Sequence, residues 1–252
     1  MAEPVIETQG LAKAFGAKPV LRGVDLQVAR GESLVVIGGS GTGKSVLLKC
    51  ILGLVRPDAG TLRLNGQPSL RPGPAFLDRF GMLFQGGALF DSLPVWQNVA
   101  FRLLRGPDRA RARPRAIEKL QRVGLGPEVA DLYPAQLSGG MQKRVGLARA
   151  IATDPEVIFF DEPTTGLDPI RAGIINELIR GIVTETGATA ITITHDMSSV
   201  RAIADRVAML HDGRIRWTGP AAGLDQADDD AVQQFIHGHA HGPLTTPRPT
   251  AS

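Results

Sequence analysis

The chain has 252 residues, 43% of them hydrophobic, and a formal net charge of +3. This length and apolar content suit one large α/β domain, or one domain with a small appendage, and the low net charge gives no argument for nucleic acid as a partner. The single cysteine, Cys50, excludes a disulfide framework and a cysteine-rich zinc site within the chain.

Runs of β-branched and aliphatic residues alternate with stretches of helical period, which favours a mainly parallel sheet covered by helices. Strands are expected, in chain order, at Val5–Thr8, Val24–Val28, Ser33–Ile37, Gly60–Leu64, Phe80–Phe84, Val157–Phe160, Thr189–Thr194, Val207–Leu210 and Arg214–Trp217. Helices are expected at Lys44–Leu54, Trp96–Leu104, Arg109–Val123, Gly140–Ala152, Ile170–Thr186, Ser198–Ala204 and, more weakly, Asp228–Gly238.

The segment between Gln85 and Ala152 has a helical pattern with no strand, unlike the alternation on either side of it. We therefore expect a domain of residues 1–236 with a helical subdomain inserted at about residues 86–152. Residues 237–252 are rich in His, Thr and Pro and are expected to form a flexible tail. His237, His239 and His241 leave a metal site as the alternative, but no cysteine or carboxylate lies near them in sequence.

No apolar run approaches the roughly 20 residues that a membrane-spanning helix needs. The first residues also lack the basic and apolar regions of a secretion signal. A reduced, cytosolic setting is therefore expected.

A glycine-rich loop connects the expected strand Ser33–Ile37 to the helix that begins at Lys44, and this strand–loop–helix order is the context of a P-loop. Backbone N–H groups and the positive end of the helix are expected to bind the β-phosphate of a nucleotide. Lys44 is then expected to bridge the β- and γ-phosphates, and the Ser45 hydroxyl to bind Mg²⁺. The expected nucleotide-binding residues here are Gly38, Gly39, Ser40, Gly41, Thr42, Gly43, Lys44, Ser45 and Val46.

Asp161 and Glu162 follow four apolar residues, which is typical of a buried strand that ends at the ligand-binding edge of a parallel sheet. Asp161 is expected to hold Mg²⁺ through its water shell, and Glu162 to polarise the attacking water. His195 follows another apolar strand and can donate a hydrogen bond to a γ-phosphate oxygen. Taken singly, a histidine at a strand end is more often structural.

Three further residues are candidates for the same site. Gln85 follows the strand Phe80–Phe84, where its amide can contact Mg²⁺ or the lytic water. Phe15 precedes the P-loop and can stack on adenine, although a core position is equally compatible with the sequence. Asp168 precedes Pro169 and is expected to cap a helix and to lie at a dimer seam.

The string Leu137-Ser138-Gly139-Gly140 opens a helix with a serine and two glycines, which forms a second anion site. One nucleotide needs only one phosphate cradle. We therefore expect Ser138, Gly139 and Gly140 to face the nucleotide of a second copy, so that the protein is an ATPase that works as a pair.

In their order and approximate spacing, these motifs together resemble the ATP-binding subunit of an ABC transporter over nearly the whole chain. The resemblance implies a P-loop NTPase fold of the ABC type, with a mainly parallel core sheet, an antiparallel β subdomain and an inserted helical subdomain. It also implies ATP and Mg²⁺ as ligands, a homodimer that sandwiches two nucleotides, and Phe15 at the adenine-stacking position. After Leu137-Ser138-Gly139-Gly140 this chain has Met141, where many members of that family have glutamine.

The segments Gly81–Val99 and Leu137–Ala150 resemble the MlaF family, the ATPases of intermembrane phospholipid transport. That resemblance implies an integral permease, a lipid-binding partner of the MCE type and a peripheral position on the cytoplasmic face of the inner membrane. A permease helix is expected to dock near Gln85–Trp96, where Leu89, Phe90, Leu93 and Trp96 are apolar, unless these side chains pack internally. The tail is expected to contact the neighbouring ATPase subunit.

Other functions stay open at this point. A small-solute importer shares every motif above. A soluble ABC ATPase that acts on DNA or ribosomes would normally carry a coiled-coil insertion, zinc cysteines or a second ATPase domain, and none is present in the sequence. A scaffold that binds ATP without turnover does not require Glu162 and His195.

Overall fold

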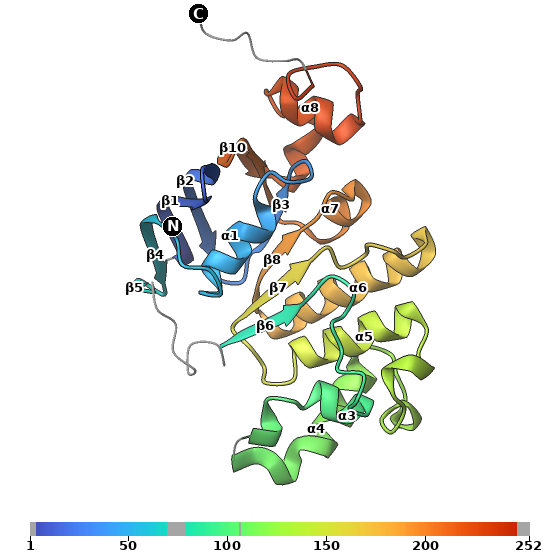
Figure 1. Cartoon of the computed structure of the whole chain (residues 1–252). Helices are drawn as coiled ribbons and strands as arrows, with labels where there is room; N and C mark the ends of the chain where they lie inside the picture. The colour runs from blue at the N-terminus through green and yellow to red at the C-terminus, as the bar shows by residue number, and fades with distance from the viewer. Residues whose placement is uncertain (1–3, 70–78, 106, 246–252) are drawn as a thin grey trace, which may run out of the picture.

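The computed structural model describes residues 4–69, 79–105 and 107–245, and it contains two β-sheets (Figure 1). A six-stranded sheet has the order β10-β9-β3-β8-β7-β6, in which β10 is antiparallel to β9 and the other neighbours are parallel. A four-stranded antiparallel sheet has the order β2-β1-β4-β5. The strands are β1 (Pro4–Phe15), β2 (Lys18–Ala29), β3 (Ser33–Ile37), β4 (Ala59–Leu64), β5 (Gln67–Pro68), β6 (Phe80–Leu83), β7 (Val157–Asp161), β8 (Thr189–Ile193), β9 (Arg206–His211) and β10 (Arg214–Pro220).

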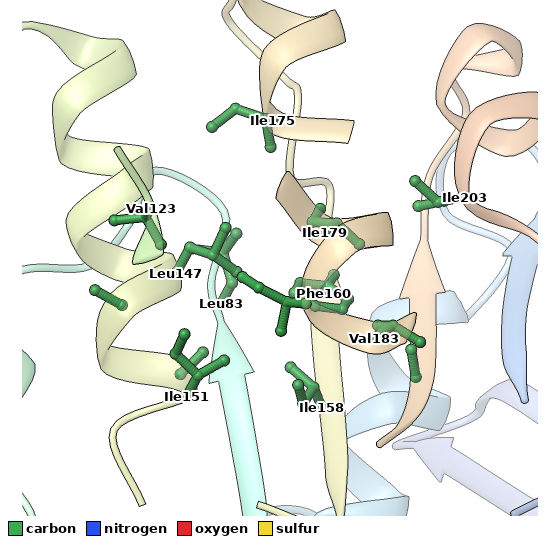
Figure 2. Close-up of a cluster of buried hydrophobic side chains, with 14 of the residues drawn as sticks. Leu83, Val123, Leu147, Ile151, Ile158, Phe160, Ile175, Ile179, Val183 and Ile203 are labelled. Atoms are coloured by element: carbon green, nitrogen blue, oxygen red, sulfur yellow. The ribbon is translucent and has the colours of Figure 1, made fainter. Parts of the chain in front are cut away.

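The parallel sheet separates two hydrophobic cores, because alternate residues of each strand point to opposite faces. In β7, Ile158 and Phe160 pack in one core with helices α5 and α6, while Val157 and Phe159 pack in the other with the antiparallel sheet. Figure 2 shows the first of these cores around Phe160. Burial on both faces explains why these central strands are almost continuously apolar.

Helices cover the parallel sheet and form the segment between β6 and β7. The α-helices are α1 (Lys44–Ile51), α3 (Val95–Val99), α4 (Ala112–Arg122), α5 (Gly139–Ala150), α6 (Pro169–Thr186), α7 (Met197–Ile203) and α8 (Asp230–His237). Short 3-10 turns lie at Leu103–Arg105, Pro107–Arg111, Pro127–Val129, Pro134–Gln136 and Ala221–Gln226. In the described part of the chain the segment between β6 and β7 has no strand, and it lies at the end of the molecule opposite α8 (Figure 1).

The expected mainly parallel α/β architecture is confirmed, but the first two strands are much longer than the apolar pattern predicts. Each of β1 and β2 has 12 residues, whereas only Val5–Thr8 and Val24–Val28 were expected. Their pairing shifts register at several points, including between Thr8 and Leu11. Each shift breaks the two-residue alternation that identifies a strand in sequence.

The expected helix Trp96–Leu104 is wrong beyond its first turn. Helix α3 ends at Val99, and within it Asn98 is fully buried and turns its side chain back to the preceding loop. Its amide accepts a hydrogen bond from the Phe90 N–H (2.7 Å) and donates to the carbonyl oxygens of Phe90 (3.1 Å) and Leu93 (2.9 Å). Beyond Val99 the backbone instead forms a 3-10 turn at Leu103–Arg105, in which the Arg105 N–H donates to the Arg102 carbonyl oxygen (3.4 Å).

The short helix expected near Asp228–Gly238 is confirmed as α8, and the residues after it fold back onto Gln234. The Gln234 amide donates to the His239 carbonyl oxygen (3.1 Å) and accepts from the Leu244 N–H (2.7 Å). Residues 246–252 of the predicted tail lie outside the described residues. Among the helices that are described, none has the length and apolarity to cross a bilayer.

Candidate functional site

The P-loop leaves β3 at Gly38 and enters α1 at Lys44, as the sequence predicts. Gly38 has a φ of +148°, and a Cβ there would lie 2.3 Å from the Leu210 carbonyl oxygen. Gly43 caps α1 with a φ of +105°, and a Cβ there would press against Val20 and Leu21 at 3.0 to 3.1 Å. Both ends of the loop therefore require glycine, because a side chain would be strained and would clash there. The loop is short, so α1 begins close to the carboxyl edge of the sheet.

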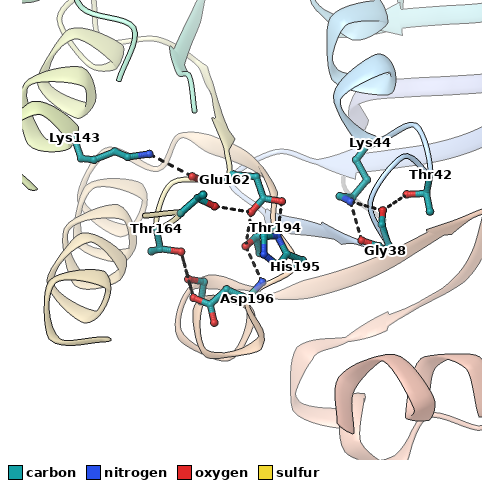
Figure 3. A network of polar contacts seen from close by, with 12 residues as sticks. Gly38, Thr42, Lys44, Lys143, Glu162, Thr164, Thr194, His195 and Asp196 are labelled. Carbon is teal, nitrogen blue, oxygen red and sulfur yellow. Dashed lines mark hydrogen bonds and ion pairs between the residues drawn. The ribbon is translucent and has the colours of Figure 1, made fainter. Parts of the chain in front are cut away.

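Lys44 lies across this loop, buried against its backbone (Figure 3). Its ammonium donates hydrogen bonds to the carbonyl oxygens of Gly38 (2.7 Å) and Gly39 (2.9 Å). Burial lowers the pKa of Lys44, while the nearby charges of Glu162 and Asp161 act against that decrease. The loop therefore holds a cation on its carbonyl oxygens and near two carboxylates, which suits a triphosphate with a divalent cation.

Replacing Lys44 by alanine is expected to weaken ATP binding by about 10- to 100-fold, because a hydrogen bond to a charged group contributes about 1.5–3 kcal/mol. Isothermal titration with ATP measures the loss. Arg63→Ala, which removes an exposed cation in β4, is the matched control and should bind within about twofold of the parent. Equal affinity of Lys44→Ala and the parent would remove Lys44 from the phosphate site.

Glu162 lies at the centre of a polar network beyond the end of β7 (Figure 3). One carboxylate oxygen lies 2.9 Å from His195 Nδ1, and the other accepts hydrogen bonds from the hydroxyl groups of Thr165 (3.2 Å) and Thr194 (3.3 Å). The Glu162 side chain is 13% exposed, whereas that of His195 is 64% exposed. The structure thus brings together the predicted base and the predicted phosphate-contacting histidine, with the histidine on the open side.

Asp196 joins the loops that carry these two residues. Its carboxylate accepts hydrogen bonds from the hydroxyl groups of Ser199 (2.7 Å) and Thr164 (3.2 Å). Burial favours the neutral acid, but the hydrogen bonds from Ser199 and Ser198 hold the pKa of Asp196 below its usual value. The segments after β7 and β8 are therefore fixed relative to each other, and so are Glu162 and His195.

Asp161 ends β7, with its carboxylate partly buried. Burial and the adjacent Glu162 raise the pKa of Asp161, while Lys49, Lys44 and Lys143 oppose the rise. The Asp161 carboxylate and the Ser45 hydroxyl supply hard oxygen donors, which fit Mg²⁺. Among the described residues, no cluster of three His, Cys, Asp or Glu side chains could hold a metal ion.

Gln85 lies two residues beyond β6, at the same edge of the sheet and exposed. The hydrogen bonds that link the described residues around Glu162 do not include its side chain. The structure therefore places Gln85 next to the candidate site but not within its polar network.

Ser138 precedes α5, and its hydroxyl oxygen accepts a hydrogen bond from the Met141 N–H (3.3 Å). Among the residues that the structure describes, a Cβ added at Gly139 would meet no atom within 4 Å, and one at Gly140 would meet only Arg171, at 3.8 Å. Neither glycine has a left-handed backbone. Packing within this chain therefore does not require the two glycines, and the start of α5 presents its N–H groups on an open face.

Asp168 caps α6, as expected, by accepting hydrogen bonds from the N–H groups of Ile170 (3.1 Å) and Arg171 (3.0 Å). Phe15 ends β1 with 52% of its surface exposed, so the core alternative for this ring is wrong. The Lys13 ammonium lies 5.4 Å from the centre of the Phe15 ring.

Sequence reasoning assigned no role to Lys143, Thr165 or Thr194, which all contact Glu162. Thr194 ends the predicted strand before His195, so its position beside the site was available from the sequence. Nothing in the local pattern marks Lys143, because a lysine on a helix usually faces solvent.

A protein-family model described as ABC transporter matches residues 21–165 of this chain. The chain is 40% identical over 245 residues to the probable ribonucleotide transport ATP-binding protein mkl of Mycobacterium leprae, covering 95% of this chain and 70% of that protein. It is 37% identical over 269 residues to the chloroplastic protein TRIGALACTOSYLDIACYLGLYCEROL 3 of Arabidopsis thaliana, covering 96% and 76%. It is 41% identical over 225 residues to the methionine import ATP-binding protein MetN of Brucella abortus, covering 86% and 60%.

Solved structures have the same fold. The dimeric structure of the bacterial ABC transporter cassette MJ0796 superposes with a TM-score of 0.78 at 30% identity, covering 86% of this chain and 98% of that one. The structure of cbiO1 from Clostridium perfringens, part of the ABC transporter complex cbiONQ, gives a TM-score of 0.80 at 26% identity over 94% and 96%.

Proposed function

Because this chain belongs to the ABC transporter family, whose ATP-binding subunits bind and hydrolyse ATP with Mg²⁺, we propose that its ATP hydrolysis drives phospholipid transport between inner and outer membranes. The observation that carries the lipid assignment is the relative of Arabidopsis thaliana, which is named after a glycerolipid and matches 96% of this chain. The resemblance of residues 81–99 to the MlaF family supports the same assignment.

In the proposed reaction Lys44 and the P-loop N–H groups bind the phosphates of ATP, and Ser45 and Asp161 hold Mg²⁺, with Gln85 near them. Bound Mg²⁺ supplies charge neutralisation at the phosphate oxygens. Glu162 accepts a proton from the attacking water, because its carboxylate is ionisable, partly buried and held by three donors. His195 donates a hydrogen bond toward the γ-phosphate from its exposed side.

The proposed active form is a homodimer with two composite sites. The open start of α5, at Ser138, Gly139 and Gly140, contacts the nucleotide held by the P-loop of the other copy. Asp168, at the exposed start of α6, lies at the seam between the copies. The dimeric cassette with a similar fold supports this arrangement.

A permease helix is proposed to dock in a groove of 450 Å³ between α1, β6 and the helical segment. Exposed apolar side chains line this groove, among them Leu54, Phe84 and Phe90. The Phe90 ring packs against that of Phe101, tilted by 32° with 4.6 Å between ring centres. Of the expected docking residues, Leu89 and Trp96 are partly buried against the core, so we propose the Phe84 and Phe90 side of the loop as the docking surface.

The proposed complex also contains a lipid-binding protein of the MCE type, lies on the cytoplasmic face of the inner membrane, and uses residues 237–252 to contact the second ATPase subunit. Import of a small solute is the second candidate, favoured by the 41% identity to the methionine import protein. That match covers 86% of this chain, against 95% and 96% for the other two relatives. The match of 96% to the protein named after a glycerolipid favours lipid transport over methionine import.

The experiment is to purify the tagged full-length chain with its membrane complex and to reconstitute that complex in liposomes that contain a fluorescent phospholipid. ATP-dependent movement of the lipid is expected, with stimulation of ATP hydrolysis by phospholipid, and an MCE-type protein is expected in the complex. The same complex with Glu162→Gln is the control. If methionine or a ribonucleotide stimulates hydrolysis and phospholipid does not, lipid transport is the wrong assignment.

A further inference from the structure

Lys143 extends from α5 to the loop after β7, where its ammonium donates a hydrogen bond to the Glu162 carbonyl oxygen at 3.5 Å (Figure 3). The residue is only 4% exposed. A buried ammonium is unfavourable unless fixed partners compensate it. The partners here are the Glu162 peptide and the negative charges of Glu162 and Asp161, which oppose the decrease in the pKa of Lys143 that burial causes.

The peptide that Lys143 contacts has an unusual backbone. Glu162 has a φ of +50°, in the left-handed region that residues with a side chain rarely adopt. Such a conformation persists only where surrounding contacts hold it. On the N–H side of the residue, Glu162 donates to the Ile193 carbonyl oxygen (2.9 Å). On the carbonyl side it accepts from the Thr165 N–H (3.3 Å) and from the Lys143 ammonium (3.5 Å), which is the contact that comes from another element.

The neighbours of Lys143 on α5 serve other contacts. The Gln142 amide donates to the Pro134 carbonyl oxygen (3.0 Å), and Arg144 donates to the Gly124 carbonyl oxygen (3.4 Å). Both side chains brace loops within the helical segment. Lys143 differs because it connects that segment to the end of β7.

We propose that Lys143 is a positioning residue for ATP hydrolysis, whose buried ammonium holds the left-handed Glu162 backbone so that the carboxylate points toward Thr194, His195 and the attacking water. The inference rests on the proposed role of Glu162 as the base. Lys143 does not touch the nucleotide in this role. It acts through the orientation of Glu162, and orientation errors of about 1 Å at a reacting group can reduce rates by about 100-fold.

The experiment compares Lys143→Met, Lys143→Arg and the parent full-length protein in steady-state ATP hydrolysis and in ATP binding. Lys143→Met is expected to lower kcat by about 10- to 100-fold, with KM and the Kd for ATP within about twofold. Lys143→Arg, which restores a buried cation, should recover most of the rate. Lys119→Met is the matched control, because Lys119 is also buried in the helical segment but pairs with Asp154 (2.7 Å). It should lower the thermal midpoint and leave kcat per folded molecule unchanged.

A double variant separates positioning from general damage. If Lys143 acts through Glu162, adding Lys143→Met to Glu162→Gln should not reduce the residual rate further. Multiplicative losses, a parent-like kcat in Lys143→Met, or an equal loss of kcat in Lys119→Met would overturn the inference. Parent-like turnover in Glu162→Gln alone would instead overturn the proposed base. If Lys143→Met does not fold, the test uses Lys143→Arg, alone and combined with Glu162→Gln. A folded Lys143→Arg protein with no ATP hydrolysis would contradict the proposal.

Discussion

Glu162→Gln is expected to hydrolyse ATP at least about 100-fold more slowly than the parent, because a positioned general base contributes about 10²- to 10⁴-fold to the rate. Glutamine has the same shape as glutamate and can keep hydrogen bonds to Thr165 and Thr194, but it cannot accept the proton of the attacking water. ATP binding should persist, since the P-loop contacts of Lys44 are not altered. The expected consequence is a dimer trapped with ATP, which size-exclusion chromatography with ATP and light scattering can detect.

The matched control for this experiment is Glu177→Gln, at an exposed position in the middle of α6. Its turnover should remain within about twofold of the parent, because an exposed substitution far from a special contact has little effect. Parent-like hydrolysis by Glu162→Gln would mean that another group accepts the proton, and the network around Glu162 would then be structural.

Ser138→Arg is expected to abolish turnover while leaving ATP binding to the isolated chain largely intact. The long cationic side chain would occupy the open face at the start of α5, where Gly139 and Gly140 leave room for a second molecule. The variant also loses a helix cap, which stabilises a helix by about 0.5–2 kcal/mol. Turnover, ATP affinity and thermal unfolding should be measured on the same preparation.

Ser138→Ala separates these two effects, because alanine removes the Met141 cap without adding bulk. Its thermal midpoint should fall as far as that of the arginine variant, while more activity is retained. Undiminished hydrolysis by Ser138→Arg would exclude a composite site built from two copies.

Local motifs made much of the candidate site predictable. The P-loop lies between β3 and α1 because its requirements are local: a buried strand, two glycines that no other residue can replace and a helix start. Asp161, Glu162 and His195 were predictable because parallel strands bring their carboxyl ends to one edge. The helix cap at Asp168 was predictable because a proline such as Pro169 favours the first position of a helix.

The features that sequence could not supply depend on contacts between distant segments. Lys143 lies 19 residues before Glu162, and only the packing of α5 beside β7 joins them. The left-handed backbone of Glu162 carries no sequence signal, since glutamate there does not mark a positive φ. The length of β1 was hidden by register shifts, which break the two-residue alternation of the sequence.

Helix α5 begins next to Ser138 and carries Lys143 little more than one turn later. Because an α-helix rises 1.5 Å per residue, these two positions are about 7.5 Å apart along a stiff rod. In the proposed dimer, the start of this helix contacts the ATP bound by the other subunit, while Lys143 orients the Glu162 carboxylate of its own subunit. Hydrolysis at one site is therefore expected to depend on whether the neighbouring site holds ATP.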